Sequence, residues 1–345
     1  MRAVRLHAPG EPLRVEEVAT PEPSGTEVRI RVAGCGVCHT DLHIVDGIQP
    51  RVELPVTIGH EVAGWIDAVG PGAEGLLGRH GLESGTSVVV FGGWGCGECR
   101  ECTAGQEQRC AFSRAPGFQA DGGYAEFMLV PDPRHLVPLK RLDAVRAAPL
   151  ADAGLTPYRA VRRAEPWLTA GARVLVIGCG ALGQFALQYL RLLPDAGGEL
   201  LVAVRELSPA RLERATELGA DLALLDGEPD MTLDALGAPA DVVFDFVGTE
   251  PTLAHASAVV AQGGLIVLVG EAGGSLAFSF DQPPIESWLT TVAWGSRDDL
   301  REVVALAERH RIEWQVDTLP LSDAAIAHER LRAGEVAGRQ VLVPG

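Results

Sequence analysis

Basic residues are scarce in this 345-residue sequence, and long apolar runs are missing. Lys and Arg number 29 against 46 Asp and Glu, which gives a formal net charge of −17 at pH 7. Binding to phosphate backbones needs clustered Lys and Arg, so this balance argues against a nucleic-acid partner. No stretch approaches the roughly 20 apolar residues of a membrane span, which argues against a membrane partner. Residues 1–7 lack the apolar core of a secretory signal, and we expect a cytoplasmic protein.

The sequence also lacks internal repeats and low-complexity tracts. Its 47% hydrophobic and 22% charged residues are typical of an ordinary globular protein. A chain of this length is long for one hydrophobic core. The sequence therefore predicts two domains.

Seven cysteines are present, and in a reducing compartment clustered cysteines are metal ligands more often than disulfides. Four of them follow the pattern C-x2-C-x2-C-x7-C: Cys96, Cys99, Cys102 and Cys110. Four thiolates close a tetrahedral zinc site entirely with protein ligands, which is typical of a structural zinc. A redox dithiol is the alternative, but it needs only two cysteines at a helix start.

A second candidate metal site combines Cys38, in the Gly-flanked segment 34–43, with His60 in a Gly-His-Glu sequence. Thiolate and neutral imidazole are ligands that zinc prefers, and a catalytic zinc takes three protein ligands and leaves one position open. These two residues alone leave another interpretation open. Cys38 could be a buried apolar residue and His60 a hydrogen-bonded loop histidine.

The first third of the chain has the pattern of a compact, barrel-like β domain. Alternating or continuous apolar residues predict strands at 28–32, 62–70 and 88–91, with Gly and Pro between them. Beyond residue 148 the pattern changes to strands that alternate with helices, at 173–177, 200–204, 241–245 and 264–270. This alternation predicts a parallel, doubly wound sheet.

A G-x-G-x-x-G sequence follows the strand at 173–177 and opens a helix at 184–193. In this context it is a dinucleotide fingerprint: the glycines allow a tight turn, a close approach of the pyrophosphate and close helix packing. The helix N-terminus then faces the phosphates. A glycine-rich turn without a ligand is the alternative. The candidate cofactor contacts are Gly178, Gly180, Ala181, Leu182 and Gly183.

Glu206 ends the next strand, where an acidic side chain accepts hydrogen bonds from the adenosine ribose and repels a 2′-phosphate. It favours NAD over NADP. Arg205 and Arg211 are nearby cations that act against this preference, and Arg211 is a further candidate cofactor contact. Past residue 296 we expect a helix at 297–309 and a strand at 340–343 that pack back onto the first domain.

Together and in this order, these motifs resemble the zinc-dependent alcohol dehydrogenases of the medium-chain dehydrogenase/reductase superfamily, over essentially the whole chain. Within it, the sequence is most similar to bacterial NAD-dependent secondary-alcohol dehydrogenases. The resemblance implies an α/β protein with a β-rich GroES-like catalytic domain at 1–153 and 296–345 and a Rossmann NAD-binding domain at 154–295. It also implies two zinc ions per subunit, NAD(H), a small alcohol or carbonyl substrate, and a homodimer or homotetramer formed through the coenzyme-domain sheet.

The resemblance assigns Cys38 and His60 as catalytic zinc ligands. The third ligand of many members is a cysteine, and here Asp152 stands at that position, as it does in some members. Glu61 matches a carboxylate that approaches the metal transiently, and it is the rival third ligand. A helix cap is the remaining alternative for Asp152.

The resemblance also implies roles around the reacting atoms. Thr40 would hydrogen-bond the substrate oxygen, and His43 would stand at the outer end of a proton relay. His39 and Arg339 would contact the cofactor pyrophosphate. The residues near the nicotinamide end would be Val247, Val269 and Trp294.

Two other classes of protein are alternatives to this prediction. A zinc-free enone or quinone reductase on the same scaffold would lack the set of Cys38, His60 and Asp152. A non-enzymatic NAD-binding protein would have lost a metal ligand or a fingerprint glycine. Neither loss is seen in this sequence.

Overall fold

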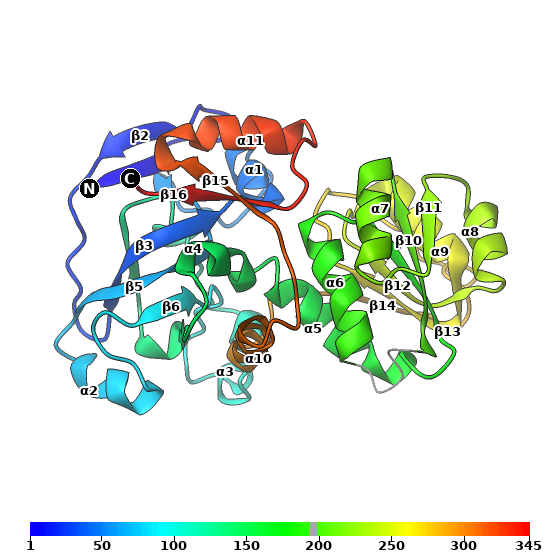
Figure 1. The fold of residues 1–345 in the computed structure, drawn as a ribbon, viewed down its shortest axis with the longest axis horizontal. Helices are drawn as coiled ribbons and strands as arrows, with labels where there is room; N and C mark the ends of the chain where they lie inside the picture. Colours follow the sequence, from blue (N-terminus) through cyan, green and yellow to red (C-terminus); the bar gives the residue numbers. More distant parts are fainter. Residues whose placement is uncertain (194–198) are drawn as a thin grey trace. The chain divides into compact units, whose positions relative to one another are not determined.

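The computed structural model describes residues 1–193 and 199–345, and it divides into two compact units. The first comprises Met1–Leu155 and Trp294–Gly345, and the second comprises Thr156–Ala293. Figure 1 shows the fold with its elements labelled. Each unit has its own β-sheets.

The first unit is rich in β-strands. Its strands are β1 (Arg2–Leu6), β2 (Arg14–Glu17), β3 (Val28–Gly36), β4 (Val56–Thr57), β5 (Glu61–Val69), β6 (Ser87–Val90), β7 (Phe127–Val130), β8 (Leu136–Pro138), β15 (Val316–Pro320) and β16 (Arg339–Val343). One sheet has the order β2-β1-β4, and the larger has the order β15-β16-β3-β5-β6-β8, with β7 also paired to β3. The C-terminal strand β16 therefore returns to pair with β3, as the sequence predicted for its tail.

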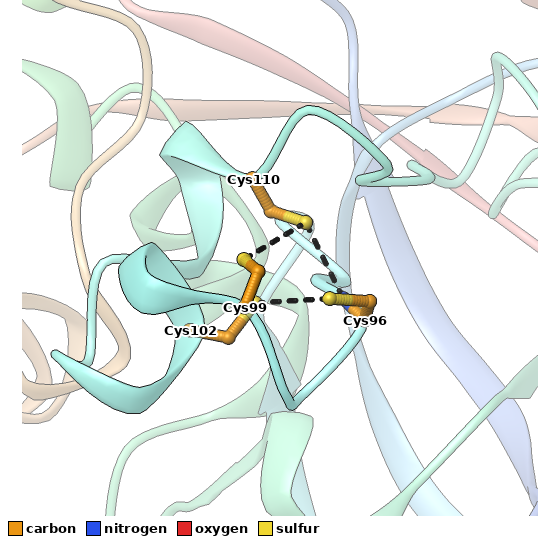
Figure 2. Close-up of side chains that lie close together, drawn as sticks. All are labelled: Cys96, Cys99, Cys102 and Cys110. Atoms are coloured by element: carbon orange, nitrogen blue, oxygen red, sulfur yellow. Dashed lines mark hydrogen bonds between the residues drawn. The ribbon is translucent and has the colours of Figure 1, made fainter.

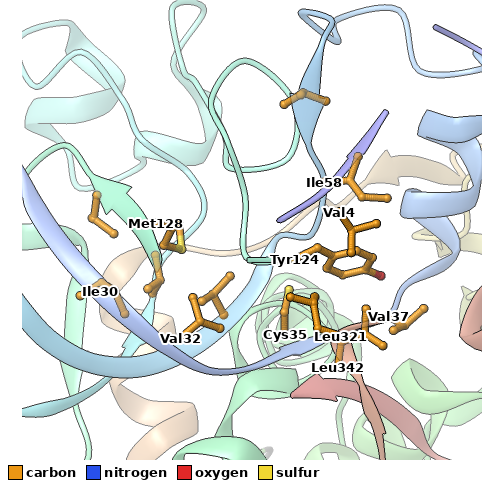
Figure 3. Close-up of a cluster of buried hydrophobic side chains, with 14 of the residues drawn as sticks. Val4, Ile30, Val32, Cys35, Val37, Ile58, Tyr124, Met128, Leu321 and Leu342 are labelled. Carbon is orange, nitrogen blue, oxygen red and sulfur yellow. The ribbon is translucent and has the colours of Figure 1, made fainter. Parts of the chain in front are cut away.

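Short helices connect these strands. They are α1 (His39–Val45), α2 (Glu74–Leu77), α3 (Arg100–Thr103), α4 (Ala144–Ala147), α10 (Arg297–Glu308) and α11 (Ala324–Arg332). A buried apolar cluster fills this unit. It joins β1, β3 and β5 to α1 and α11 (Figure 3). Burial of this cluster anchors the N-terminal third and the C-terminal segment in one core.

The second unit is a doubly wound parallel sheet of the order β11-β10-β9-β12-β13-β14. The strands are β9 (Arg173–Ile177), β10 (Leu201–Glu206), β11 (Leu222–Leu225), β12 (Ala240–Asp245), β13 (Val260–Leu268) and β14 (Trp288–Thr291). The helices are α5 (Leu155–Ala164), which begins at the last residue of the first unit, α6 (Ala181–Leu192), α7 (Pro209–Glu217), α8 (Pro229–Leu236) and α9 (Glu250–Val259). Helices α6 and α7 lie on one face of the sheet, and α8 and α9 lie on the other (Figure 1). The predicted fold class is confirmed.

Candidate active site and metal centres

The four-cysteine segment forms one compact cluster around the short helix α3 (Figure 2). Cys96 Sγ lies 3.9 Å from Cys102 Sγ, and Cys99 Sγ lies 3.7 Å from Cys110 Sγ. Sulfurs that each bind a tetrahedral zinc at about 2.3 Å lie about 3.8 Å apart, so the spacing fits zinc. All four corners are occupied by protein, and the cluster has no open position for a substrate.

The second cluster brings together Cys38, His60, Glu61 and Asp152, with one ligand atom of each within 4.8 Å of the others. Cys38 Sγ and His60 Nε2 lie 3.8 Å and 3.6 Å from the same oxygen, Asp152 Oδ2. Three ligands at about 2.0–2.3 Å from a tetrahedral zinc are about 3.3–3.8 Å from one another. Both distances to Asp152 Oδ2 fit ligands of a tetrahedral zinc, and the ligand atoms of Cys38 and His60 lie within 4.8 Å of each other.

Backbone geometry explains why these side chains converge. Cys38 follows β3 and is the N-cap of α1, where its N–H donates to the carboxylate of Asp41 at 2.8 Å. Gly59 has a φ of +97°, and a Cβ there would stand 2.2 Å from the Tyr124 ring. Only glycine allows the chain to approach this closely, and the approach places His60 directly before β5.

Glu61 is held by a cation on its other side. Arg339 Nε donates to Glu61 Oε2 at 2.9 Å, a second guanidinium nitrogen contacts Oε1, and the Ala153 N–H donates to the same Oε1 at 3.0 Å. Arg339 is itself buried and lies 4.0 Å from Asp152. Both Glu61 oxygens therefore have hydrogen-bonding partners outside the Cys38–His60–Asp152 set.

The electrostatics of this cluster favour a bound divalent cation. The carboxylates of Asp41, Glu61 and Asp152 are buried in this cluster, and the buried guanidinium of Arg339 pairs with those of Glu61 and Asp152. Burial lowers the pKa of His60, but the neighbouring Asp41 and Asp152 raise that pKa well above its usual range. Negative charge converges on the imidazole, and a zinc ion would offset it.

Asp41 is a functional residue that the sequence interpretation missed. Its Oδ1 lies 3.3 Å from His60 Nδ1 in an ion-pair contact, and among the described residues neither atom makes a hydrogen bond. A carboxylate at Nδ1 holds the ring with Nε2 available to a metal, as is usual for metal-binding histidines. The acidic residue three positions after Cys38 was the only local signal.

Helix α1 carries three further predicted residues. Thr40 is half-buried, with its Oγ1 3.6 Å from Cys38 Sγ. His43 is half-buried one turn later, and its buried Nδ1 makes no hydrogen bond with any residue that the structure describes. His39 is exposed. Thr40 is therefore at the metal cluster, and His43 is on the same helix.

Two aromatic rings flank the imidazole of His60. Its centroid is 5.9 Å from that of Phe118 and 6.4 Å from that of Trp294, and the two larger rings are 6.3 Å apart. Trp294 also packs on Gly92, where a Cβ would stand 3.1 Å from the indole. The cluster thus has an apolar, aromatic wall beside its polar atoms.

In the second unit, the glycine fingerprint adopts the expected strand–turn–helix geometry. Gly178 follows β9 with a φ of +87°, and Gly180 is the N-cap of α6. A Cβ on Gly183 would stand 2.2 Å from the Gly178 carbonyl oxygen, whereas one on Gly180 would meet no atom within 4 Å. Gly183 permits close helix packing, and Gly180 leaves space for a phosphate. Ala181 and Leu182 are half-buried in the first turn of α6.

Glu206 ends β10 with its carboxylate turned towards this loop. Oε2 accepts from the Cys179 N–H at 2.8 Å, and Oε1 accepts from the N–H groups of Leu207 and Ser208 at 2.8 and 3.2 Å. Arg211 lies 3.7 Å from Oε1, whereas Arg205 pairs with Asp226. Three backbone N–H groups hold the carboxylate next to the fingerprint.

Val247 and Val269 follow the ends of β12 and β13. A Cβ on Gly178 would stand 2.7 Å from a Val247 methyl group, and the Val269 N–H donates to the Asp245 carbonyl at 2.9 Å. Both residues are thus on the fingerprint side of the sheet, at the carboxyl ends of its strands. Ligands of open α/β sheets bind outside these ends.

Comparison with known proteins identifies the family. A β-rich unit with two zinc-type clusters, combined with a dinucleotide-binding sheet, defines a zinc-dependent dehydrogenase. Residues 24–141 match the alcohol dehydrogenase GroES-like domain, and residues 218–342 match the zinc-binding dehydrogenase family. The chain belongs to the zinc-binding alcohol dehydrogenases of the medium-chain dehydrogenase/reductase superfamily.

The similarity extends over the whole chain. It is 37% identical to a D-arabinose 1-dehydrogenase (NADP(+)) of Saccharolobus solfataricus, over 99% of this chain and 97% of that one. It is 35% identical to an NAD-dependent alcohol dehydrogenase of Sulfurisphaera tokodaii, over all of both chains. The crystal structure of the Aeropyrum pernix alcohol dehydrogenase matches with a TM-score of 0.90, at 34% identity over all of both chains. The predicted family, reaction class and zinc and nicotinamide cofactors are confirmed. Among the described residues, no helix is long and apolar enough to cross a membrane.

Proposed function

We propose that the protein interconverts secondary alcohols and ketones with NAD(H), using a catalytic zinc held by Cys38, His60 and Asp152. The observation that carries this proposal is the tetrahedral spacing of the three donor atoms within a buried cluster of excess negative charge. A bound zinc supplies Lewis-acid polarisation of a substrate oxygen, and the nicotinamide supplies or accepts the hydride.

The residues of this chain bind the substrate and cofactor, orient them and transfer protons. Thr40, at the metal cluster, donates to or accepts from the substrate oxygen. His43, whose Nδ1 has no hydrogen-bonding partner in the described part of the chain, passes the proton towards solvent. His39 and Arg339 contribute positive or donor groups towards the cofactor pyrophosphate. Since Arg339 is paired with Glu61, its first role is to hold that carboxylate.

Asp152, and not Glu61, is proposed as the third ligand. Asp152 Oδ2 is the atom that both Cys38 and His60 approach, whereas both Glu61 oxygens bond to Arg339 and the Ala153 N–H. Glu61 remains close enough to approach the metal when that ion pair opens. The cysteine cluster holds a second, structural zinc.

NAD(H) is proposed as the preferred cofactor because of Glu206. Backbone donors fix its carboxylate beside the fingerprint, with Arg211 3.7 Å from Oε1, and a carboxylate at this position repels a 2′-phosphate. Arg205, the nearest rival cation in the sequence, is paired with Asp226. Arg211, Val247, Val269 and Trp294 are proposed as further cofactor contacts.

The aromatic wall of Phe118 and Trp294 beside His60 favours substrates with an apolar, planar substituent. Aromatic rings prefer edge-to-face or offset partners, which an aryl ketone provides. Aryl or bulky alkyl methyl ketones, and the corresponding secondary alcohols, are the proposed substrate class.

A homodimer or homotetramer is proposed through β14, the edge strand of the coenzyme sheet. Four large apolar side chains on and before it are exposed by 46–85%: Phe278, Phe280, Trp288 and Leu289. An exposed apolar edge strand favours pairing with a second copy. Location in the cytoplasm is also proposed, and all seven cysteines are free thiols in accord with it.

The test is NADH oxidation by purified protein with an aryl methyl ketone, a short aldehyde and a cyclic enone, repeated with NADPH. We expect carbonyl reduction with the highest kcat/KM for the aryl ketone and for NADH. Reduction of the carbon–carbon double bond of the enone alone would instead support the zinc-free reductase class. Binding of NADH without turnover of any substrate would support the non-enzymatic one.

A further inference from the structure

A line of buried polar side chains leads from His60 away from the metal cluster and into the apolar core. Asp41 lies against His60, as described above, and the Tyr124 hydroxyl lies 3.1 Å from Asp41 Oδ2. His328 Nε2 lies 3.3 Å from the same hydroxyl. The line joins α1, the loop before β7 and α11, which are far apart in the sequence.

None of these groups has access to bulk water as an alternative partner. Asp41 and Tyr124 have no exposed surface, and His328 is 6% exposed. The Tyr124 ring is embedded among apolar side chains of the core (Figure 3). A buried polar group that loses its hydrogen bond has no water to replace the lost partner, which is unfavourable. The position of each group therefore depends on the positions of its hydrogen-bonding neighbours.

The donors and acceptors of this line fix the direction of each hydrogen bond. An ionised carboxylate only accepts, so the single proton of the Tyr124 hydroxyl goes to Asp41. The hydroxyl oxygen then accepts from His328 Nε2–H. With Tyr124 and the Cys38 N–H both on Oδ2, Oδ1 of Asp41 is left for His60 Nδ1.

We propose that Tyr124 and His328 are positioning residues for the catalytic zinc: they fix the Asp41 carboxylate, which orients His60 as a ligand. The proposal rests on the proposed role of His60 in metal binding. It assigns to α11, in the C-terminal segment, a direct part in the geometry of a metal site built by the N-terminal third.

A second link between the same two helices supports this role. Arg332, one turn beyond His328 on α11, donates to Asp46 at the C-cap of α1 at 2.8 Å. This ion pair and the Tyr124 bridge hold α11 against the helix that carries Asp41. The alternative is that the Tyr124 hydroxyl merely satisfies buried groups, with no effect on the metal.

Two readouts separate these alternatives without relying on turnover. The first is the rate at which each zinc is lost to a chelator, and the second is the visible absorption of the protein with cobalt in the catalytic site. Tyr124→Phe removes the bridging hydroxyl, His328→Leu removes the second donor, and His328→Gln keeps an N–H donor. Tyr189→Phe is the matched control, because the Tyr189 hydroxyl is buried but has no hydrogen-bonding partner among the described residues.

We expect Tyr124→Phe and His328→Leu to speed loss of the catalytic zinc about tenfold, the lower end of the range for groups that support a metal ligand. Both should shift the cobalt spectrum, and the double variant should be no worse than Tyr124→Phe. His328→Gln and Tyr189→Phe should behave as wild type, and the structural zinc should be retained throughout.

Wild-type zinc loss and cobalt spectra in Tyr124→Phe would overturn the proposal. Additive effects in the double variant, or equal loss of both zincs, would overturn it as well, because they indicate separate roles or general destabilisation. If wild-type protein itself held only the cysteine-bound zinc, the proposed function would fail first, and this result is distinct from the others.

Discussion

At the scale of single residues, Asp152 is the position where the chain departs from the commoner ligand pattern, and its replacement tests the ligand assignment directly. Its replacement by Ala removes one of the three proposed ligands, and we expect the remaining Cys38 and His60 not to hold a zinc at ordinary affinity. Asp152→Ala should lose one zinc equivalent and nearly all turnover, while it keeps NADH binding. Zinc analysis, ketone-dependent NADH oxidation and NADH fluorescence titration measure these three outcomes.

Asp152→Cys is the control, since a thiolate keeps both a ligand and the charge of the site. It should retain the second zinc. A role of Asp152 in supporting another ligand predicts a loss of only about 10–100-fold in affinity or activity. A capping role predicts a stability change of about 0.5–2 kcal/mol with both zincs bound. If Asp152→Ala still bound two zinc ions, Glu61 would be the third ligand instead of Asp152.

Residues that act within a short segment were predictable from the sequence, and those that act across the fold were not. The spacing of the four cysteines indicates a zinc site, and the spacing of the fingerprint glycines indicates a dinucleotide site. Asp41 offered only its nearness to Cys38. Tyr124 contacts Asp41 across 83 residues of sequence, and His328 contacts Tyr124 across 204, so no local pattern marks either residue.

At the scale of elements, the cysteine cluster should contribute to folding more than to chemistry. A closed zinc site adds its binding free energy to the folded state. Each kcal/mol of lost stability lowers Tm by about 2–4 °C for a domain of about 150–250 residues. Cys99→Ser should therefore lose one zinc and melt earlier, with kcat/KM nearly unchanged in the folded fraction.

Cys179→Ser is the matched control for this measurement, because Cys179 is a buried thiol outside both metal clusters. It should keep both zincs and the wild-type Tm. Unchanged zinc content and melting in Cys99→Ser would remove the structural role from the cluster.

His255 on α9 should make the stability of the coenzyme unit depend on pH. Burial and then the charge of Arg205 lower its pKa to about 4, and its Nε2 lies 3.0 Å from the Thr232 hydroxyl. An unfolded histidine has a pKa of about 6.5, so between these values the unfolded chain binds more protons. Stability is therefore lost as pH falls below about 6.5.

From these two pKa values, the loss between pH 7.5 and pH 5 is about 2 kcal/mol. His255→Gln does not titrate, so its stability should fall less over the same range. Urea unfolding of both proteins at the two pH values measures the difference. Parallel pH dependence of the two proteins would show that His255 is charged as readily in the folded state.

Strong buried strands were also predictable, whereas exposed edge strands were not. Strand β9 occupies the predicted residues 173–177, because it is apolar, buried on both faces and followed by the fingerprint. Strands β11 and β14 were missed, since they are four residues long and largely exposed. Their place in the sheet comes from pairing with β10 and β13 and not from a burial pattern.

At the scale of the whole molecule, the chain makes its catalytic unit from two distant segments. Strand β16 pairs with β3, and α11 joins the core of the N-terminal third. The C-terminal segment thus supplies Arg339 to Glu61 and His328 to Tyr124. The sequence predicted the return of the tail to the first domain, but not that it reaches the metal cluster.

The central claim is that one of two zincs per chain carries the reaction. The most direct test withdraws zinc from the purified enzyme stepwise with a chelator, and measures zinc per chain and ketone-dependent NADH oxidation in each sample. We expect about two equivalents at the start, from the two ligand clusters. Turnover should fall in proportion to the loss of the first equivalent and return when zinc is added. Full turnover in protein that holds only the cysteine-bound zinc would contradict it.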